Sequence, residues 1–204
     1  MEKKKIVIFI SGRGSNMAAI LNQIEDGILK DICEVPLVLS NNNDAPGLEI
    51  AKKYNVKTKV IPSRNKSRSS FEAELIDLLD KIEFDYIVLA GFMRILTKKF
   101  VEKYRNKIIN IHPADTKKYQ GACGYKWAYD NNLDKTYITV HYVDEGVDTG
   151  TIIAQTEVDL SGLRSLEEIK EKGLSVEHKF YSEVLAKLIG ANTENKSSSK
   201  LKEQ

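Results

Sequence analysis

The chain has 204 residues, of which 42% are hydrophobic and 29% are charged, and its formal net charge is +2. This length suits one domain with a sizeable core, and the small net charge argues against a nucleic-acid or membrane-surface partner. The two cysteines, Cys33 and Cys123, match neither a disulfide framework nor a zinc spacing. No signal peptide or transmembrane run is evident, so we expect a cytoplasmic protein without a metal site.

The first half of the chain alternates short apolar runs with helical patterns. Continuous β-branched runs are typical of strands buried on both faces, and their alternation with helices favours a parallel sheet with right-handed crossovers. Strands are predicted at 6–10, 35–39, 59–61 and 86–90, and helices at 17–24, 46–53, 71–82 and 97–104, the last capped by Thr97.

The pattern changes after a short predicted strand at 107–110. Residues 136–143 and 150–158 are expected to pair as antiparallel edge strands. A helical region follows from Leu166 to Leu188, interrupted near Gly173. We therefore predict an α/β fold with a mostly parallel twisted sheet, in a single domain over 1–189. Residues 190–204 are almost entirely polar and are predicted to form a disordered tail.

Two loops could bind anions. The loop Ser11–Asn16 lies between a buried strand and a helix, where backbone N–H groups suit a phosphate. The alternative interpretation is a tight turn in which Ser15 or Asn16 serves only as a helix cap. It matches neither the Walker A nor the dinucleotide pattern. The basic loop at 62–70 also suits an anionic group, but a solvated capping loop is the more ordinary interpretation.

The most informative residues are Asn110, His112 and Asp148. In an extended chain, residues two apart face the same way, and Pro113 biases His112 away from helical geometry. The amide and the imidazole should therefore converge at a strand end. With a carboxylate, they form a set suited to acyl transfer through a tetrahedral intermediate.

In these motifs the chain resembles the phosphoribosylglycinamide formyltransferase family of folate-dependent purine synthesis. The resemblance covers nearly the whole chain up to the tail. It is carried by four segments in order, at 10–16, 89–96, 110–113 and 148–150. It implies a Rossmann-like formyltransferase fold. It also implies an enzyme, monomeric or homodimeric, that transfers the formyl group of 10-formyltetrahydrofolate to glycinamide ribonucleotide.

The resemblance also implies roles for individual residues. Asn110, His112 and Asp148 would be catalytic. Gly14, Ser15 and Asn16 would hold the substrate phosphate, and Glu177 would contact the same substrate. The folate side would be formed by Arg68, Met93, Arg94, Ile95, Leu96 and the backbone around Asp144.

The chain departs from the family after Pro113, where Ser-Leu-Leu-Pro is replaced by Ala114-Asp115-Thr116-Lys117. Losing the proline should make this loop more flexible, and we expect it to alter folate or nucleotide handling. Cys123 stands where the family has a histidine, and we expect a half-buried packing residue there. Two alternatives stay open: another folate-dependent formyltransferase or formyltetrahydrofolate hydrolase, and a non-catalytic folate- or nucleotide-binding protein on this fold.

Overall fold

A computed structural model describes residues 2–200, and these form one seven-stranded sheet covered by helices on both faces. The strands are β1 (Lys4–Ile10), β2 (Cys33–Ser40), β3 (Thr58–Val60), β4 (Tyr86–Leu89), β5 (Ile108–His112), β6 (Lys135–Tyr142) and β7 (Ile152–Asp159). Their order is β3-β2-β1-β4-β5-β6-β7. Strands β1 to β5 run parallel, whereas β6 and β7 pair antiparallel at one edge, which confirms the predicted fold class.

The central strands are buried on both faces, as their continuous apolar runs predict. In β1, Ile6, Ile8 and Ile10 pack into one core cluster, and Val7 and Phe9 pack into the other. All five are fully buried. Successive side chains of a strand point to opposite faces, so one apolar run supplies both cores.

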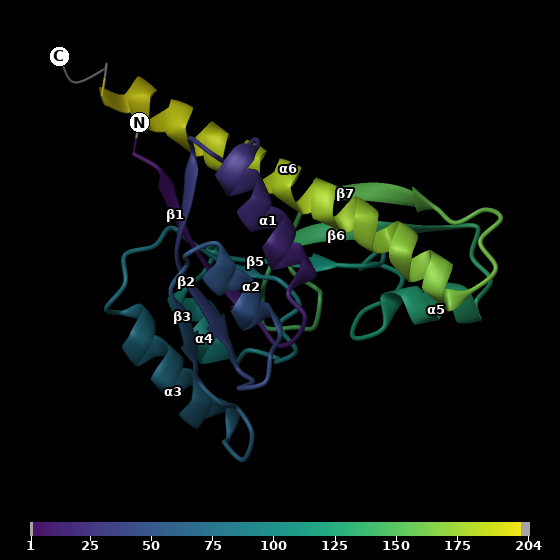
Figure 1. Cartoon of the computed structure of the whole chain (residues 1–204), viewed down its shortest axis with the longest axis horizontal. Helices are drawn as coiled ribbons and strands as arrows, with labels where there is room; N and C mark the ends of the chain where they lie inside the picture. The colour runs from purple at the N-terminus through teal and green to yellow at the C-terminus, as the bar shows by residue number, and fades with distance from the viewer. Residues whose placement is uncertain (1, 201–204) are drawn as a thin grey trace.

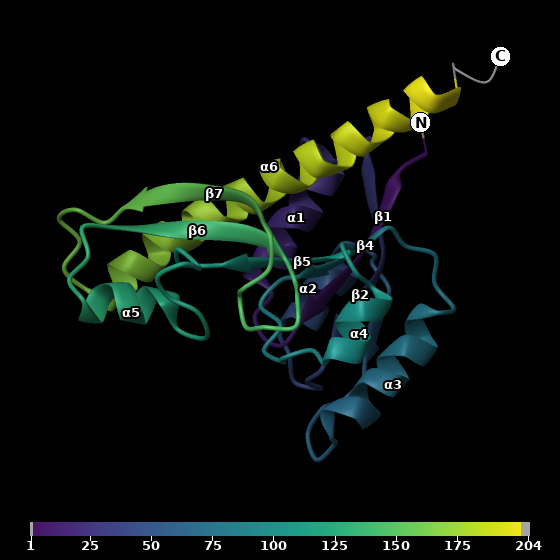
Figure 2. The same cartoon turned by 180° about the vertical axis from the view of Figure 1, so that it is seen from behind.

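The helices divide between the two faces. Helices α1 (Ser15–Asp26), α2 (Gly47–Lys53), α5 (Gly124–Asp130) and α6 (Leu166–Lys200) pack on the larger core cluster, and α3 (Arg68–Leu79) and α4 (Lys98–Lys103) pack on the other. Figures 1 and 2 show α6 running alongside α1 and past β6 and β7, away from α3. Among the described residues, no helix is both long and apolar enough to cross a lipid bilayer.

Three details differ from the sequence predictions. Helix α6 is continuous through Gly173. The glycine is explained by packing and not by a helix break, since a Cβ there would lie 2.2 Å from the ring of Tyr125. Helix α5, seven residues long, was not predicted at all. The backbone of α6 also continues to Lys200, where we expected a disordered tail from residue 190, and residues 201–204 lie outside the described residues.

Tyr181 fastens α6 to the middle of the sheet. Its side chain is fully buried, and its hydroxyl lies 3.1 Å from two backbone carbonyl oxygens, those of Leu89 in β4 and Ile109 in β5. A shared hydroxyl proton satisfies both acceptors. The strand that carries Asn110 is therefore tied directly to the helix behind it.

We predict that Tyr181→Phe lowers the free energy of unfolding by about 1–3 kcal/mol, because it leaves two buried carbonyls without this donor while the ring still fills its space. Urea denaturation measures the change. Tyr129→Phe is the matched control, since Tyr129 is 40% exposed on α5 and should be nearly neutral. Equal stability of Tyr181→Phe and the wild type would show that the hydroxyl is unimportant.

Candidate active site

Strands β5 and β6 place three polar side chains on one face of the sheet. Asn110 and His112 are two residues apart in β5 and point the same way, as their spacing predicts. In the antiparallel partner β6, His141 lies directly opposite Asn110. His112 and His141 are 4% and 2% exposed, so both imidazoles are removed from bulk water.

The turn after β6 carries the carboxylate to this cluster. The side chain of Asp144 closes the turn by accepting hydrogen bonds from the Gly146 N–H (3.0 Å) and the Thr149 hydroxyl (2.6 Å). Gly150 allows the chain to return against β6, since a Cβ there would lie 1.8 Å from the carbonyl oxygen of Tyr142. Asp148 adopts a left-handed φ of 53°, which Asp tolerates better than most residues.

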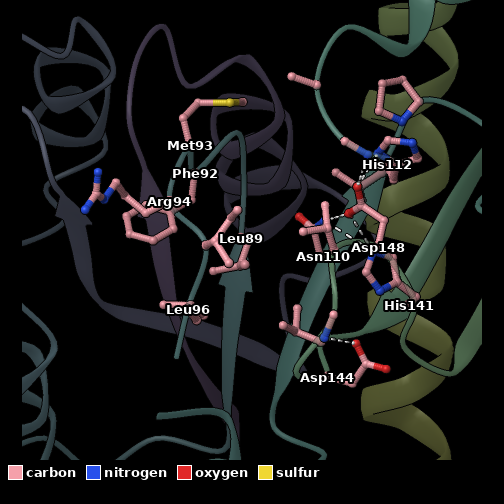
Figure 3. Close-up of a pocket in the computed structure, with 18 of the residues that line it drawn as sticks. Leu89, Phe92, Met93, Arg94, Leu96, Asn110, His112, His141, Asp144 and Asp148 are labelled. Atoms are coloured by element: carbon pink, nitrogen blue, oxygen red, sulfur yellow. Dashed lines mark hydrogen bonds and ion pairs between the residues drawn. The ribbon is translucent and has the colours of Figure 1, made fainter. Parts of the chain in front are cut away.

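Asp148 is the centre of the cluster. One carboxylate oxygen lies 3.3 Å from His112 Nδ1 and accepts a 2.9 Å hydrogen bond from the Gly121 N–H. The other accepts from Asn110 Nδ2 at 3.3 Å and lies 3.5 Å from His141 Nε2. Figure 3 shows these contacts converging on one point. The structure thus brings together the three residues that the sequence analysis selected, from segments far apart in the chain.

His141 is the member of the cluster that the sequence analysis missed. Besides its contact with Asp148, its Nε2 lies 3.2 Å from Asn110 Nδ2, and its Nδ1 lies 2.8 Å from the carbonyl oxygen of Tyr142. A carbonyl only accepts, so Nδ1 carries a proton and donates it to Tyr142. The sequence placed His141 in a predicted strand at 136–143, but that strand was expected to pair with 150–158, and its pairing with the strand of Asn110 was not predicted.

Burial and charge act against each other on the two titrating groups. Burial lowers the pKa of His112 below its usual value, while the charge of Asp148 and the carbonyl of Tyr119 oppose that shift. For Asp148, burial alone would raise the pKa, but the hydrogen bond from His141 and the nearby His112 bring it below the usual carboxyl value. Asp148 is therefore ionised at neutral pH, and the neighbouring His112 is neutral. Each ring nitrogen of His112 faces an acceptor, Asp148 at Nδ1 and the carbonyl of Tyr119 at Nε2.

The rewritten loop after Pro113 frames the cluster with hydrogen bonds. The side chain of Asp115 accepts from the Lys117 N–H (3.0 Å), so a hydrogen-bonded turn stands in place of the family's proline. The carbonyl of Tyr119, farther along, lies 3.1 Å from His112 Nε2. Cys123, expected to be half-buried packing, is instead exposed and lines the neighbouring cavity, because its left-handed φ of 70° turns the chain into α5 there.

The polar cluster forms one wall of a cavity of about 570 Å³. The opposite wall is the segment Met93–Leu96, and Asp144 lies at the rim. Met93 and Ile95 are 70% and 53% exposed. Large apolar side chains that are clustered and solvent-exposed are typical of a ligand-binding surface. In Figure 3 the guanidinium of Arg94 points away from Asn110 and Asp148, so this side chain does not join the cluster.

A second cavity of about 230 Å³ lies at the start of α1. It is lined by Ser11–Asn16, with Met93 shared between both cavities. Gly14 precedes the helix at a φ of 71°, and no side chain among the described residues caps its first turn. The expectation that Ser15 or Asn16 is merely a helix cap is therefore wrong, and the open N–H groups favour an anion site.

Glu177 of α6 lies behind this loop. Its carboxylate accepts a 2.6 Å hydrogen bond from Asn16 Nδ2 and another from the hydroxyl of Tyr125 in α5. Glu177 is 5% exposed. It is thus joined to the glycine loop through Asn16, and its contact with the substrate stays a prediction.

Arg68, like Glu177, is not among the residues that line the two cavities. It is the exposed first residue of α3, and Ser67 before it caps that helix by accepting from the Ser70 N–H at 3.1 Å. The capping interpretation of this basic loop is confirmed for Ser67. A role for Arg68 in binding folate stays a prediction.

The chain is similar to known proteins over most of its length. Residues 4–185 match the family described as Formyl transferase. A Bacillus subtilis phosphoribosylglycinamide formyltransferase is 33% identical over 190 residues, which are 93% of this chain and 96% of that protein. A trifunctional purine biosynthetic protein of Drosophila pseudoobscura pseudoobscura is 37% identical over 91% of this chain, but the chain spans only 14% of that protein's length.

Solved structures agree with this similarity. The structure of a phosphoribosylglycinamide formyltransferase from Coxiella burnetii has a TM-score of 0.86 and 36% identity, covering 93% of this chain and 89% of that one. One from Bacillus halodurans has a TM-score of 0.86 and 34% identity, covering 91% and 95%. The chain therefore belongs to the formyl transferase family and, within it, to the phosphoribosylglycinamide formyltransferases.

Proposed function

We propose that this protein transfers the formyl group of 10-formyltetrahydrofolate to the amine of glycinamide ribonucleotide. The observation that carries the proposal is the meeting of Asn110, His112 and Asp148 at one wall of the 570 Å³ cavity. The choice of acceptor is supported by the full-length relative from Bacillus subtilis, whose name specifies phosphoribosylglycinamide.

The two cavities suit the two substrates. The nucleotide phosphate would lie at the N-terminus of α1 on Gly14, Ser15 and Asn16, where the helix dipole and open N–H groups favour an anion. Glu177 would contact the same substrate. The larger, mostly apolar cavity would hold the folate against Met93, Arg94, Ile95 and Leu96, with Asp144 at its rim and Arg68 near the anionic end of the folate.

In the reaction, the substrate amine attacks the formyl carbon, and negative charge develops on the formyl oxygen. Asn110 donates a hydrogen bond to this oxygen, and His112 donates another or carries the proton. The tetrahedral intermediate collapses when the bond from carbon to N10 of the folate breaks. A proton leaves the amine and one is gained at N10, so the step balances without a redox partner.

Asp148 serves this chemistry by its charge and position. Its carboxylate lies 3.3 Å from His112 Nδ1, on the opposite side of the ring from Tyr119, whose carbonyl faces Nε2. Such flanking acceptors stabilise the imidazolium that forms when His112 takes a proton. Asp148 also helps to remove the amine proton through water.

A formyl-transfer assay tests the proposal. Release of tetrahydrofolate from 10-formyltetrahydrofolate is followed with and without glycinamide ribonucleotide. Release that depends on the nucleotide, with one formylated product per turnover, is expected. Release in its absence would indicate the hydrolase, and binding of both ligands without any release would indicate a non-catalytic protein.

We predict that Asn110→Ala or His112→Ala lowers kcat by roughly 100- to 1000-fold, because each removes a donor to the developing oxyanion. Steady-state turnover measures the loss, and circular dichroism checks that the variants fold. Asn131→Ala, at the exposed end of α5, is the control and should keep full activity. Turnover close to wild type in either site variant would refute the assigned roles.

Asp148→Asn tests the electrostatic role of the carboxylate. The charge of Asp148 raises the pKa of His112 against the effect of burial, so its removal should lower that pKa further below the ordinary value of about 6.5. Imidazolium then forms less readily, and kcat should fall by roughly 100- to 10,000-fold. An NMR titration of the His112 ring measures the pKa, with His178 on α6 as the internal reference. An unchanged or raised pKa for His112 would contradict this role.

A further inference from the structure

Met93 stands between the two cavities and lines both. Its backbone N–H donates a 2.7 Å hydrogen bond to the hydroxyl of Ser11, the first residue of the glycine loop. The N–H of Ser11 in turn donates to the carbonyl of Gly91 at 3.1 Å. Ser11, a residue of the smaller cavity, therefore contacts the segment Gly91–Met93 at two points, and Met93 begins the wall of the larger cavity.

The hydrogen bonds continue away from Met93. The Ser11 hydroxyl donates to Asn41 Oδ1 at 2.5 Å, and Asn41 Nδ2 donates to the hydroxyl of Ser63 at 2.9 Å. Met93, Ser11, Asn41 and Ser63 follow the carboxyl ends of β4, β1, β2 and β3, which are neighbours in the sheet. A hydroxyl that accepts one hydrogen bond and donates another strengthens both.

We propose that Ser11 is a positioning residue that couples the two cavities, so that a ligand on the glycine loop tightens binding in the cavity lined by Met93–Leu96. The inference rests on the proposed function, which assigns nucleotide and folate to these cavities. Occupation of the loop by an anion holds Ser11 in place, and its two bonds hold Gly91 and Met93. Coupling of this kind is reciprocal, so folate would also tighten nucleotide binding.

The far end of the same wall has a separate anchor. Thr97 donates its N–H to Glu72 at 2.7 Å and its hydroxyl to the other oxygen of that carboxylate. Glu72 is 4% exposed on α3 and lies on the face of the sheet away from the glycine loop. Of these two anchors, only Ser11 also belongs to the smaller cavity, which is why the coupling is assigned to Ser11.

The experiment measures the Kd of tetrahydrofolate, which has no formyl group to transfer, with and without saturating glycinamide ribonucleotide. In the wild type the nucleotide should tighten binding by about 5-fold or more. In Ser11→Ala this ratio should fall toward one, and the KM for 10-formyltetrahydrofolate should rise several-fold while kcat changes little. Ser161→Ala, a serine remote from both cavities between β7 and α6, should behave as wild type.

Asn41→Ala provides a graded second variant. It removes the acceptor behind Ser11 but leaves the bonds to Gly91 and Met93, so the ratio should lie between those of the wild type and Ser11→Ala. If Ser11→Ala does not fold, Asn41→Ala decides the question, because undiminished coupling there would overturn the proposal.

The failure of this inference is separate from the failure of the proposed function. If the wild type formylates the nucleotide but shows no coupling, or if Ser11→Ala keeps the full ratio, the role of Ser11 is wrong and the enzyme assignment stands. If the wild type does not formylate the nucleotide, the proposed function fails and this inference falls with it.

Discussion

The half-buried carboxylate of Asp148 makes the contacts on which the site depends. It lies among an amide, two imidazoles and a backbone N–H that come from β5, β6 and the loop after Pro113. Without it, the Gly121 N–H would lose its partner and His112 would lose the charge that favours its protonated form. The turn from Asp144 to Gly150 is closed by its own hydrogen bonds, and its conformation places the Asp148 side chain in the cluster.

The sheet explains why two cavities adjoin this carboxylate. Strands β1 and β4 are neighbours, but the chain leaves them in opposite directions, to α1 on one face and toward α4 on the other. Ligands bind in the crevice at such a switch point in parallel sheets. The glycine loop follows β1 and the Met93–Leu96 wall follows β4, so an anion site and an apolar cleft open side by side. Strand β5, next in order, then places Asn110 and His112 beside the cleft.

Much of this could be predicted from the sequence because the signals are local. Apolar runs predicted the strands of the first half, partly alternating patterns predicted the last two, and the i, i+2 spacing of Asn110 and His112 placed both on one face. The helix-cap reading of the glycine loop failed, because a left-handed Gly14 rather than a side chain begins α1. The prediction of a helix interruption at Gly173 was wrong. A glycine that makes room for the ring of Tyr125 cannot be told from a helix-breaking glycine in the sequence.

What the sequence could not supply is register and contact across the fold. His141 is important only because it lies opposite Asn110, and one residue of slip in β6 would turn it to the other face. The hydrogen bond between Ser11 and Met93 joins residues 82 apart in the chain, and no sequence pattern in either segment predicts it. Helix α5 is short and follows a left-handed Cys123, so it lacks the length and the capping residue by which helices are recognised.

The central claim is that Asn110, His112 and Asp148 act around one carbonyl group. The most direct measurement is a crystal structure with glycinamide ribonucleotide and a folate analogue whose formyl group cannot be transferred. The account predicts the formyl oxygen about 2.7–3.2 Å from Asn110 Nδ2, with the nucleotide amine facing the formyl carbon and His112 within reach of both. A formyl group turned away from Asn110, toward solvent or toward Arg94, would contradict it.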